Sequence, residues 1–223
     1  MALLESIEKQ TGPAPTATII VLHGLGADGN DFVPVAQELE LSSIGDVRFV
    51  FPHAQVIPVT INNCQAMRAW YDILGFDLVK REDEAGLRRS MAQVEELIAR
   101  EIEGGVPADR IVLMGFSQGC AMALMTGLRH KERLAGIVGL SGYLPLAATT
   151  TSERTDANAM TPIFMGHGTQ DNVVVAERGR ASRDMLKALG HDVDWNEYPM
   201  AHSVCMEEIQ DLNAWLLKVL RTP

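Results

Sequence analysis

The stretch between residues 110 and 121 constrains the fold of this chain more than any other. An apolar, β-branched run leads into a Gly-x-Ser-x-Gly motif, and a helical pattern of small residues begins at once. A serine on such a sharp strand-to-helix turn stands clear of the sheet, within reach of a base. Gly115 and Gly119 sit where a Cβ would clash with neighbouring backbone. Ser117 is therefore the candidate nucleophile, and the helix is predicted to start at Gln118.

Composition is typical of a globular protein. The 223 residues are 47% hydrophobic and 22% charged, which predicts one domain spanning residues 1–223. The formal net charge of −10, with no cluster of Lys or Arg, argues against a nucleic-acid partner. Three cysteines without a C-x-x-C spacing indicate a reducing compartment.

The same sequence gives no sign of a targeting or membrane segment. Glu5 and Glu8 stand where a signal peptide would carry positive charge. No apolar stretch approaches the ~18 residues of a membrane span. We therefore expect a cytoplasmic protein with no integral membrane segment.

Apolar runs alternate with helical patterns along the chain. Short apolar runs predict strands at residues 17–23, 47–51, 111–116, 135–140 and 162–168, and a last strand is predicted at 193–198. Helices are predicted at 86–103 and 204–219, where apolar residues recur three or four apart, and also from 118 to about 129 and over a stretch ending near 189. This alternation predicts an α/β fold with a mostly parallel sheet and helices on both faces. Residues 54–85 are expected to be irregular, and residues 143–161 are too few for a cap domain.

An acid and a histidine follow the serine in the order that a nucleophile turn requires. Asp171 comes just after the strand at 162–168, and His202 comes just after the strand at 193–198. The order Ser, Asp, His at successive strand ends predicts a catalytic triad. Asp171 could instead cap the following helix. Asp156 and Asp184 are poorly placed as acids, and His53 and His167 end strands outside the required order.

The predicted triad implies acyl transfer. His202 would take the Ser117 proton, and Asp171 would hold the imidazole and stabilise its cation. Backbone N–H groups of Gln118 and Leu25 would bind the oxyanion. No His, Cys or carboxylate cluster has metal-ligand spacing, so no metal or other cofactor is expected.

The glycine-rich loop at residues 24–29 allows another interpretation. It matches G-x-G-x-x-G after a strand, a pattern typical of dinucleotide binding. The next strand, however, ends in Pro52-His53, with no acid to hold a ribose. An oxyanion-hole loop is favoured.

A family resemblance covers residues 17 to about 220. The motifs Leu-His-Gly-Leu-Gly-Ala-Asp-Gly-Asn-Asp-Phe at 22–32, Trp-Tyr-Asp at 70–72, Gly-Phe-Ser-Gln-Gly at 115–119 and Tyr-Pro-Met-x-His at 198–202 resemble the bacterial carboxylesterase and acyl-protein thioesterase/lysophospholipase family. The resemblance implies a minimal α/β-hydrolase fold, with Ser117, Asp171 and His202 as the triad and Leu25 and Gln118 as oxyanion donors. It also implies homodimers whose contact lies near the site mouth.

The same resemblance suggests where the substrate binds. The segment from Trp70 to Phe76 (with Leu74 within it) would build an acyl groove, with contributions from Tyr143 and Val173. From the residues alone, this aromatic segment could equally be a loop pinned to the core.

Hydrolysis of short to medium carboxylic esters is the expected activity, on a small-molecule or lipid ester. An acyl-protein thioesterase or a lysophospholipase is the alternative, and a non-catalytic binding protein on the same scaffold is a further one. The sequence departs from the family pattern at Cys120, Asn172 and Ala201, and none of these positions carries a catalytic group.

Overall fold

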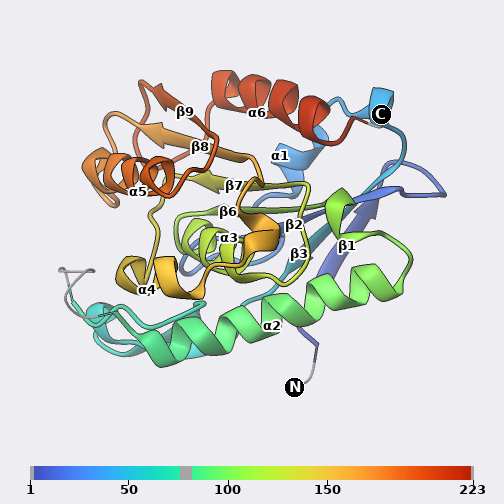
Figure 1. Ribbon diagram of the computed structural model, residues 1–223. Coiled ribbons are helices and arrows are strands. Elements are labelled where there is room, and N and C mark those ends of the chain that lie inside the picture. The colour runs from blue at the N-terminus through green and yellow to red at the C-terminus, as the bar shows by residue number, and fades with distance from the viewer. Residues whose placement is uncertain (1–2, 76–81, 222–223) are drawn as a thin grey trace.

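The computed structural model describes residues 3–75 and 82–221 (Figure 1). Its centre is a seven-stranded sheet in the order β1-β3-β2-β6-β7-β8-β9. The strands are β1 Ser6–Gln10, β2 Ala17–Leu22, β3 Val47–Pro52, β6 Ile111–Phe116, β7 Gly136–Leu140, β8 Ile163–Gly168 and β9 Val193–Tyr198. Only the edge strand β1 runs antiparallel to its neighbour within this sheet. The predicted mostly parallel sheet is confirmed.

Helices cover both faces of the sheet. They are α1 Val33–Gln37, α2 Glu84–Glu103, α3 Gln118–Arg129, α4 Ala147–Glu153, α5 Ala176–Ala188 and α6 Met206–Val219. One hydrophobic core joins the sheet to α2, α3 and α5, and a second joins it to α1 and α6. Figure 1 shows α6 and α2 on opposite sides of the strands.

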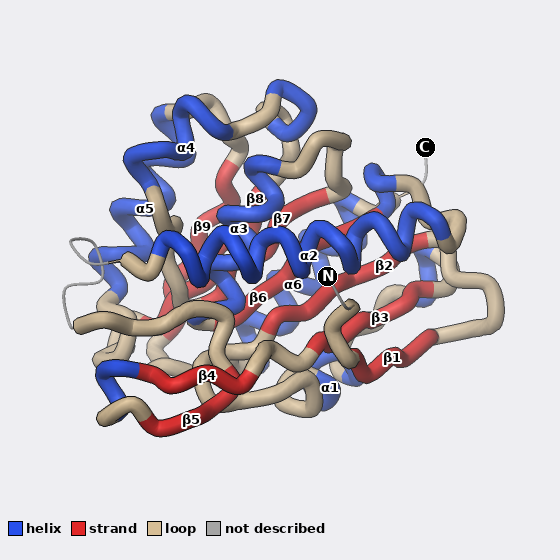
Figure 2. Tube along the Cα trace, turned by 90° about the horizontal axis from the view of Figure 1, so that it is seen from below, coloured by secondary structure: helices blue, strands red, loops and turns tan. Residues whose placement is uncertain are grey.

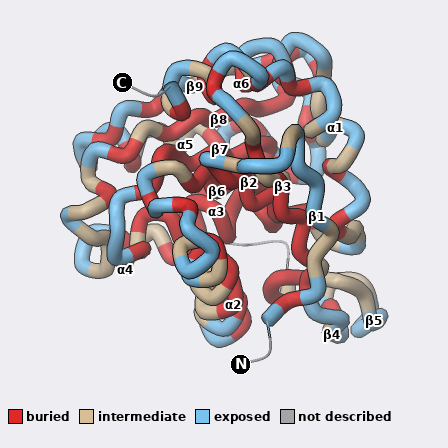
Figure 3. The backbone as a smooth tube through the Cα atoms, turned by 90° about the vertical axis from the view of Figure 1, so that its right-hand side faces the viewer, coloured by how far each residue is buried: buried red, intermediate tan, exposed pale blue. Residues whose placement is uncertain are grey.

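The continuous apolar run of β2 follows from this layering. Ile20 and Leu22 belong to the core under α3, whereas Ile19 and Val21 belong to the core under α6. Both faces of a parallel strand must be apolar when helices cover both sides. In Figure 3 strands β2, β3, β6, β7 and β8 form the buried centre, and the surrounding helices carry exposed stretches.

The expectation that residues 54–85 are irregular was wrong in part. Strands β4 Val56–Val59 and β5 Gln65–Arg68 form a separate antiparallel pair (Figure 2). The turn between them places Asn63 and Cys64 at positive φ, 55° and 58°. The pair was missed because Pro58 stands inside β4 and the residues of both strands, except Val59, are exposed or half-buried, so neither strand shows a buried apolar pattern.

The sequence interpretation also missed the short edge strand β1, whose residues are half-buried or exposed. Within the described residues, no helix is both long enough and apolar enough to span a bilayer.

A buried carboxyl on α6 makes the stability of this fold sensitive to pH. Glu208 is fully buried against Gly166 of β8, and neither carboxyl oxygen has a hydrogen-bond partner among the described residues. Burial, reinforced by the nearby Asp211 carboxylate, raises the pKa of Glu208 from 4.5 to about 8. The unfolded chain therefore releases this proton at lower pH than the folded chain does, and stability is lost as pH rises between these two pKa values.

We expect the free energy of unfolding to fall by about 2 to 3 kcal/mol as pH rises from 5 to 7, because of the Glu208 carboxyl. The Glu208→Gln variant keeps the shape without the charge, so it should lack this loss. Urea unfolding of both proteins across that range measures the difference. Identical pH dependence in the two proteins would contradict the assignment.

Candidate active site

The serine motif forms the turn that its glycines predict. Ser117 lies between β6 and α3 with φ 56° and ψ −115°, a conformation that side chains rarely adopt. A Cβ on Gly115 would lie 2.1 Å from the Gly119 carbonyl, and a Cβ on Gly119 would lie 1.9 Å from the Leu22 carbonyl. Only glycine allows this close approach of strand and helix. The predicted helix start at Gln118 is confirmed.

Three polar side chains from three separate loops meet at this turn. His202 follows β9 and accepts a hydrogen bond at Nε2 from Ser117 Oγ, at 3.0 Å. Its Nδ1–H donates to Asp171 Oδ2 at 2.7 Å. The carboxyl ends of parallel strands meet at one edge of the sheet, so residues 31 and 85 positions apart come together. The arrangement can move a proton from the serine to the histidine.

The second oxygen of Asp171 holds its own loop. Oδ1 accepts hydrogen bonds from the N–H groups of Val173 and Val174, at 2.8 and 2.9 Å. The helix cap that was considered for Asp171 is not formed, because α5 begins only at Ala176. The carboxylate is thus fixed from both oxygens and aims at the histidine.

A second imidazole supports this loop, and the sequence interpretation did not assign it a role. His167 of β8 is buried, and its Nε2–H donates to Val174 O at 2.7 Å. Its Nε2 also lies 3.5 Å from Asp171 Oδ2. Burial lowers the pKa of His167, which keeps it neutral near pH 7. Its position four residues before the acid, at the end of a buried strand, was the available signal.

Two backbone N–H groups near the serine have no acceptor within the described residues. Leu25 N–H makes no hydrogen bond within the described residues, although Gly26 N–H donates to Arg68 O and Ala27 N–H donates to Gly24 O. Gln118 N–H is the first of α3 and has no acceptor there either. Both residues line the cavity in front of Ser117. These are the donors that an oxyanion would need.

The glycine-rich loop offers few free N–H groups to a dinucleotide. Gly26 and Ala27 are engaged as described, and Gly29 N–H donates to His53 Nδ1 at 3.1 Å. Pyrophosphate binding would require such groups to be free at the start of a helix. The following helix, α1, is only five residues long. Oxyanion binding fits this loop better.

Trp70 does not lie where a substrate-binding residue should. It is 2% exposed and belongs to the core, and it is not among the residues lining the cavity. Its indole N–H donates to His23 O at 2.9 Å, next to the loop that carries Leu25. The Gln118 side chain accepts from Trp70 N–H and donates to Tyr71 O. Trp70 therefore ties the serine turn to the glycine-rich loop, as the pinned-loop alternative predicted.

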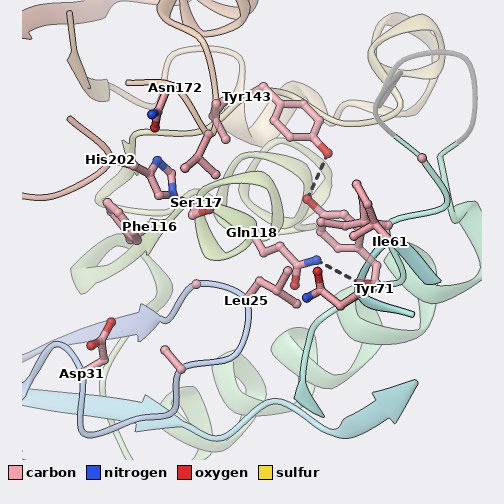
Figure 4. A pocket seen from close by; sticks show the side chains of 17 residues that line it. Leu25, Asp31, Ile61, Tyr71, Phe116, Ser117, Gln118, Tyr143, Asn172 and His202 are labelled. Carbon is pink, nitrogen blue, oxygen red and sulfur yellow. Dashed lines mark hydrogen bonds between the residues drawn. The ribbon is translucent and has the colours of Figure 1, made fainter. Parts of the chain in front are cut away.

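The cavity in front of Ser117 has a volume of about 510 Å³ (Figure 4). Of the residues expected to form an acyl groove, Tyr143 and Val173 line it. Leu74 does not, because its side chain points to solvent and is 39% exposed, while Ile73 and Gly75 line the cavity. Phe76 lies outside the described residues.

One end of this cavity is apolar. Tyr71 and Tyr143 meet there through their hydroxyl groups, 3.1 Å apart, and Ile61 lies beside them in Figure 4. The lining residues Ile61 and Ile73 contribute hydrocarbon, and Asn62 and Gln118 contribute amide groups. This end suits a chain of methylene groups, since burying each one is favourable by about 0.8 kcal/mol.

Cys120 lies behind the nucleophile, and its thiol is inaccessible to reactants. It is fully buried, and burial raises the pKa of its thiol. A Cβ on Gly142 would come within 2.5 Å of its Sγ, so the thiol fills the space that the glycine leaves. Within the described residues, no group of three or more His, Cys, Asp or Glu side chains could hold a metal ion.

Comparisons with known proteins match nearly the whole chain. The family model described as phospholipase/carboxylesterase matches residues 4–220. An acyl-protein thioesterase 1 of Neurospora crassa is 44% identical over 214 residues, which cover 92% of this chain and 87% of the relative. That relative is fungal, so the bacterial character suggested by the sequence resemblance is not what this match supports.

Solved structures agree on the fold. Arabidopsis thaliana SOBER1 has a TM-score of 0.87 and 31% identity, over 92% of this chain and 99% of that one. Zea mays acyl-protein thioesterase 2 has a TM-score of 0.86 and 28% identity, over 97% and 99% of the two chains. The predicted α/β-hydrolase fold is thus confirmed.

Proposed function

This chain belongs to the phospholipase/carboxylesterase family, and from that premise we propose that it is a serine hydrolase that removes acyl groups from thioesters, in the manner of an acyl-protein thioesterase. The observation that carries the proposal is the hydrogen-bonded series from Ser117 through His202 to Asp171, opening on a cavity with an apolar end. The curated relatives support the thioesterase alternative better than the carboxylesterase expected first.

The proposed reaction begins with acyl transfer to the serine. His202 Nε2 takes the proton as Ser117 Oγ attacks the acyl carbon, and Asp171 Oδ2 stabilises the imidazolium through Nδ1–H. The N–H groups of Leu25 and Gln118 receive the carbonyl oxygen as it becomes negative. The carbon–sulfur or carbon–oxygen bond then breaks, and His202 returns the proton to the leaving atom.

Water completes the cycle in the second half. His202 removes a proton from water, the hydroxide attacks the acyl-serine, and Ser117 leaves as its hydroxyl is reprotonated. The acyl chain departs as a carboxylate. A thiolate is a better leaving group than an alkoxide, so one site can serve both kinds of ester.

The proposal is tested with a serine-reactive fluorophosphonate and a matched pair of substrates. Peptide mass spectrometry should find one adduct, on Ser117. An octanoyl thioester and an octanoyl oxygen ester, whose leaving groups differ only in sulfur or oxygen, should both be hydrolysed, with the higher kcat/KM for the thioester. Absence of both adduct and turnover would favour the non-catalytic binding protein, and turnover of the oxygen ester alone would restore the carboxylesterase.

The acyl chain is expected to contact Ile73. Replacing Ile73 by Ala should lower kcat/KM for an octanoyl substrate about tenfold relative to an acetyl substrate, because a pocket discriminates by the apolar surface that it covers. Val56→Ala is the matched control: Val56 is 60% exposed on β4 and lies outside the cavity lining. Equal losses on acetyl and octanoyl substrates in the Ile73 variant would remove this residue from the acyl site.

A further inference from the structure

One end of the cavity carries a carboxylate that the proposed mechanism does not use. Asp31 lines the cavity together with Ala27 and Phe116. In Figure 4 it lies on the opposite side of Ser117 from Ile61. The side chain is exposed and forms no hydrogen bond or ion pair within the described residues. It is therefore free to meet a ligand.

The neighbouring acid is not free in the same way. Asp28 accepts hydrogen bonds from the backbone and side-chain nitrogens of Asn30, at 2.8 and 3.0 Å, and so shapes the loop. Asp31 contributes only its backbone N–H to that loop, donating to Asp28 O. The Asp31 carboxylate therefore makes no hydrogen bond to a described residue that would give it a role in holding the loop.

This end of the cavity is where the leaving group must go. His202 returns its proton to the leaving atom, so that atom lies on the His202 side of Ser117. The Phe116 ring packs against the His202 ring, with 4.8 Å between centroids. The acyl chain takes the apolar end beyond Tyr71. The thiol or alcohol portion is then directed past Phe116 toward Asp31.

A single Asp, and no other permanently charged side chain, stands among the described residues that line the cavity. That residue is Asp31. The Arg178 guanidinium lies over the Tyr143 ring, 5.6 Å from its centroid, and Arg178 does not line the cavity. A cleft with low-dielectric walls and charge of one sign attracts ligands of the other sign. A phosphate in the leaving group would find no cation here.

We propose that Asp31 and Phe116 form a leaving-group subsite that selects thioesters whose thiol portion carries a positive charge and no phosphate. The inference rests on the proposed acyl transfer at Ser117 and adds the class of thiol portion that the site prefers. The carboxylate attracts the cation, and an aromatic ring beside it adds a cation–π contribution. The bonds made and broken are those of the thioester hydrolysis already described.

The first test compares two thioesters of equal size. Butyrylthiocholine carries a trimethylammonium group, and S-(3,3-dimethylbutyl) thiobutyrate replaces it with a neutral tert-butyl group. Thiol release measures both. We expect the wild-type kcat/KM to be about three- to tenfold higher for the cationic thioester than for the neutral one. This is the size of effect that attraction to a single exposed carboxylate produces. The preference should shrink at high salt, where exposed charges are screened.

The Asp31→Asn variant should bring the ratio of the two kcat/KM values close to one. Asp109→Asn is the matched control: it removes the same charge from an exposed residue in the turn Ala108–Arg110, which precedes β6 at the opposite end of the sheet. That control should keep the wild-type ratio, because Asp109 lies outside the cavity lining, although the net charge changes equally in both variants. A wild-type ratio near one, or the same ratio in the Asp31 variant, would overturn the subsite.

A second pair identifies the natural source of the cation. S-butyrylated cysteine peptides flanked by lysine or by acetyl-lysine differ only in charge. A preference for the lysine peptide assigns the subsite to basic protein segments, and a preference confined to thiocholine assigns it to quaternary ammonium groups. Loss of turnover on every thioester would instead defeat the proposed function, and is thereby distinguished from a failure of the subsite alone.

Discussion

Ser117→Ala is expected to lower thioester and ester hydrolysis at least ~10³-fold, because the members of a triad act as a unit. The Ala side chain keeps the Cβ and removes only Oγ, the atom that meets His202 Nε2 at 3.0 Å. The strained φ of 56° is the same for Ser and Ala, so folding should be little affected. The measurements are kcat/KM, circular dichroism and fluorophosphonate labelling. The variant should lose both turnover and the adduct while its circular dichroism spectrum stays the same.

A matched serine serves as the control. Ser141, at the end of β7, also has a positive φ of 46°, and its Oγ is buried without a partner among the described residues. It does not line the cavity. Ser141→Ala should therefore keep the labelling and the turnover. A Ser117 variant that folds and still turns over near the wild-type rate would exclude Ser117 as the nucleophile.

Asp171→Asn is expected to lower kcat by about 10⁴-fold, through the tautomer of His202 rather than through the fold. The Asn oxygen can replace Oδ1 and accept from the N–H groups of Val173 and Val174, which directs its NH₂ group at His202 Nδ1. Nδ1 then becomes an acceptor and Nε2 carries the proton. In that state Nε2 has no lone pair for the proton of Ser117.

Asp184→Asn gives the comparison for this variant. Asp184 is an exposed acid on α5 that pairs with Arg183, and the sequence places it poorly for the triad. Its replacement removes the same charge and should leave kcat within about twofold, since an exposed pair contributes little. Thermal unfolding of both variants checks that the loop after β8 is retained. An Asp171 variant with near wild-type kcat would show that another group orients the histidine.

The local sequence was sufficient to predict the turn that carries the serine. The buried strand, the two glycines and the small-residue helix all predict the same strand-to-helix turn at Ser117. The positions of Asp171 and His202 followed from the strand ends, because parallel strands bring their carboxyl ends to one edge. Those inferences depend on the periodicity of apolar residues and on the order of motifs along the chain, and both can be read from one sequence.

The local sequence did not predict the contacts between distant segments. Trp70 and Leu74 are both apolar and lie in one segment, yet Trp70 is 2% exposed in the core and Leu74 is 39% exposed. Hydrophobicity says that such a side chain gains by burial, but not which surface will cover it. The indole hydrogen bond to His23 O joins residues 47 positions apart, and no local pattern encodes it.

The sequence by itself therefore determined the layered α/β fold, the serine turn and the order of the three candidate catalytic residues. Only the tertiary structure decided that Ile73 rather than Leu74 lines the cavity, that His167 supports the acid loop, and that Asp31 stands across the cavity from the apolar end. The physical reason is that backbone periodicity is set by neighbours along the chain, whereas the lining of a cavity is set by which loops the sheet brings together.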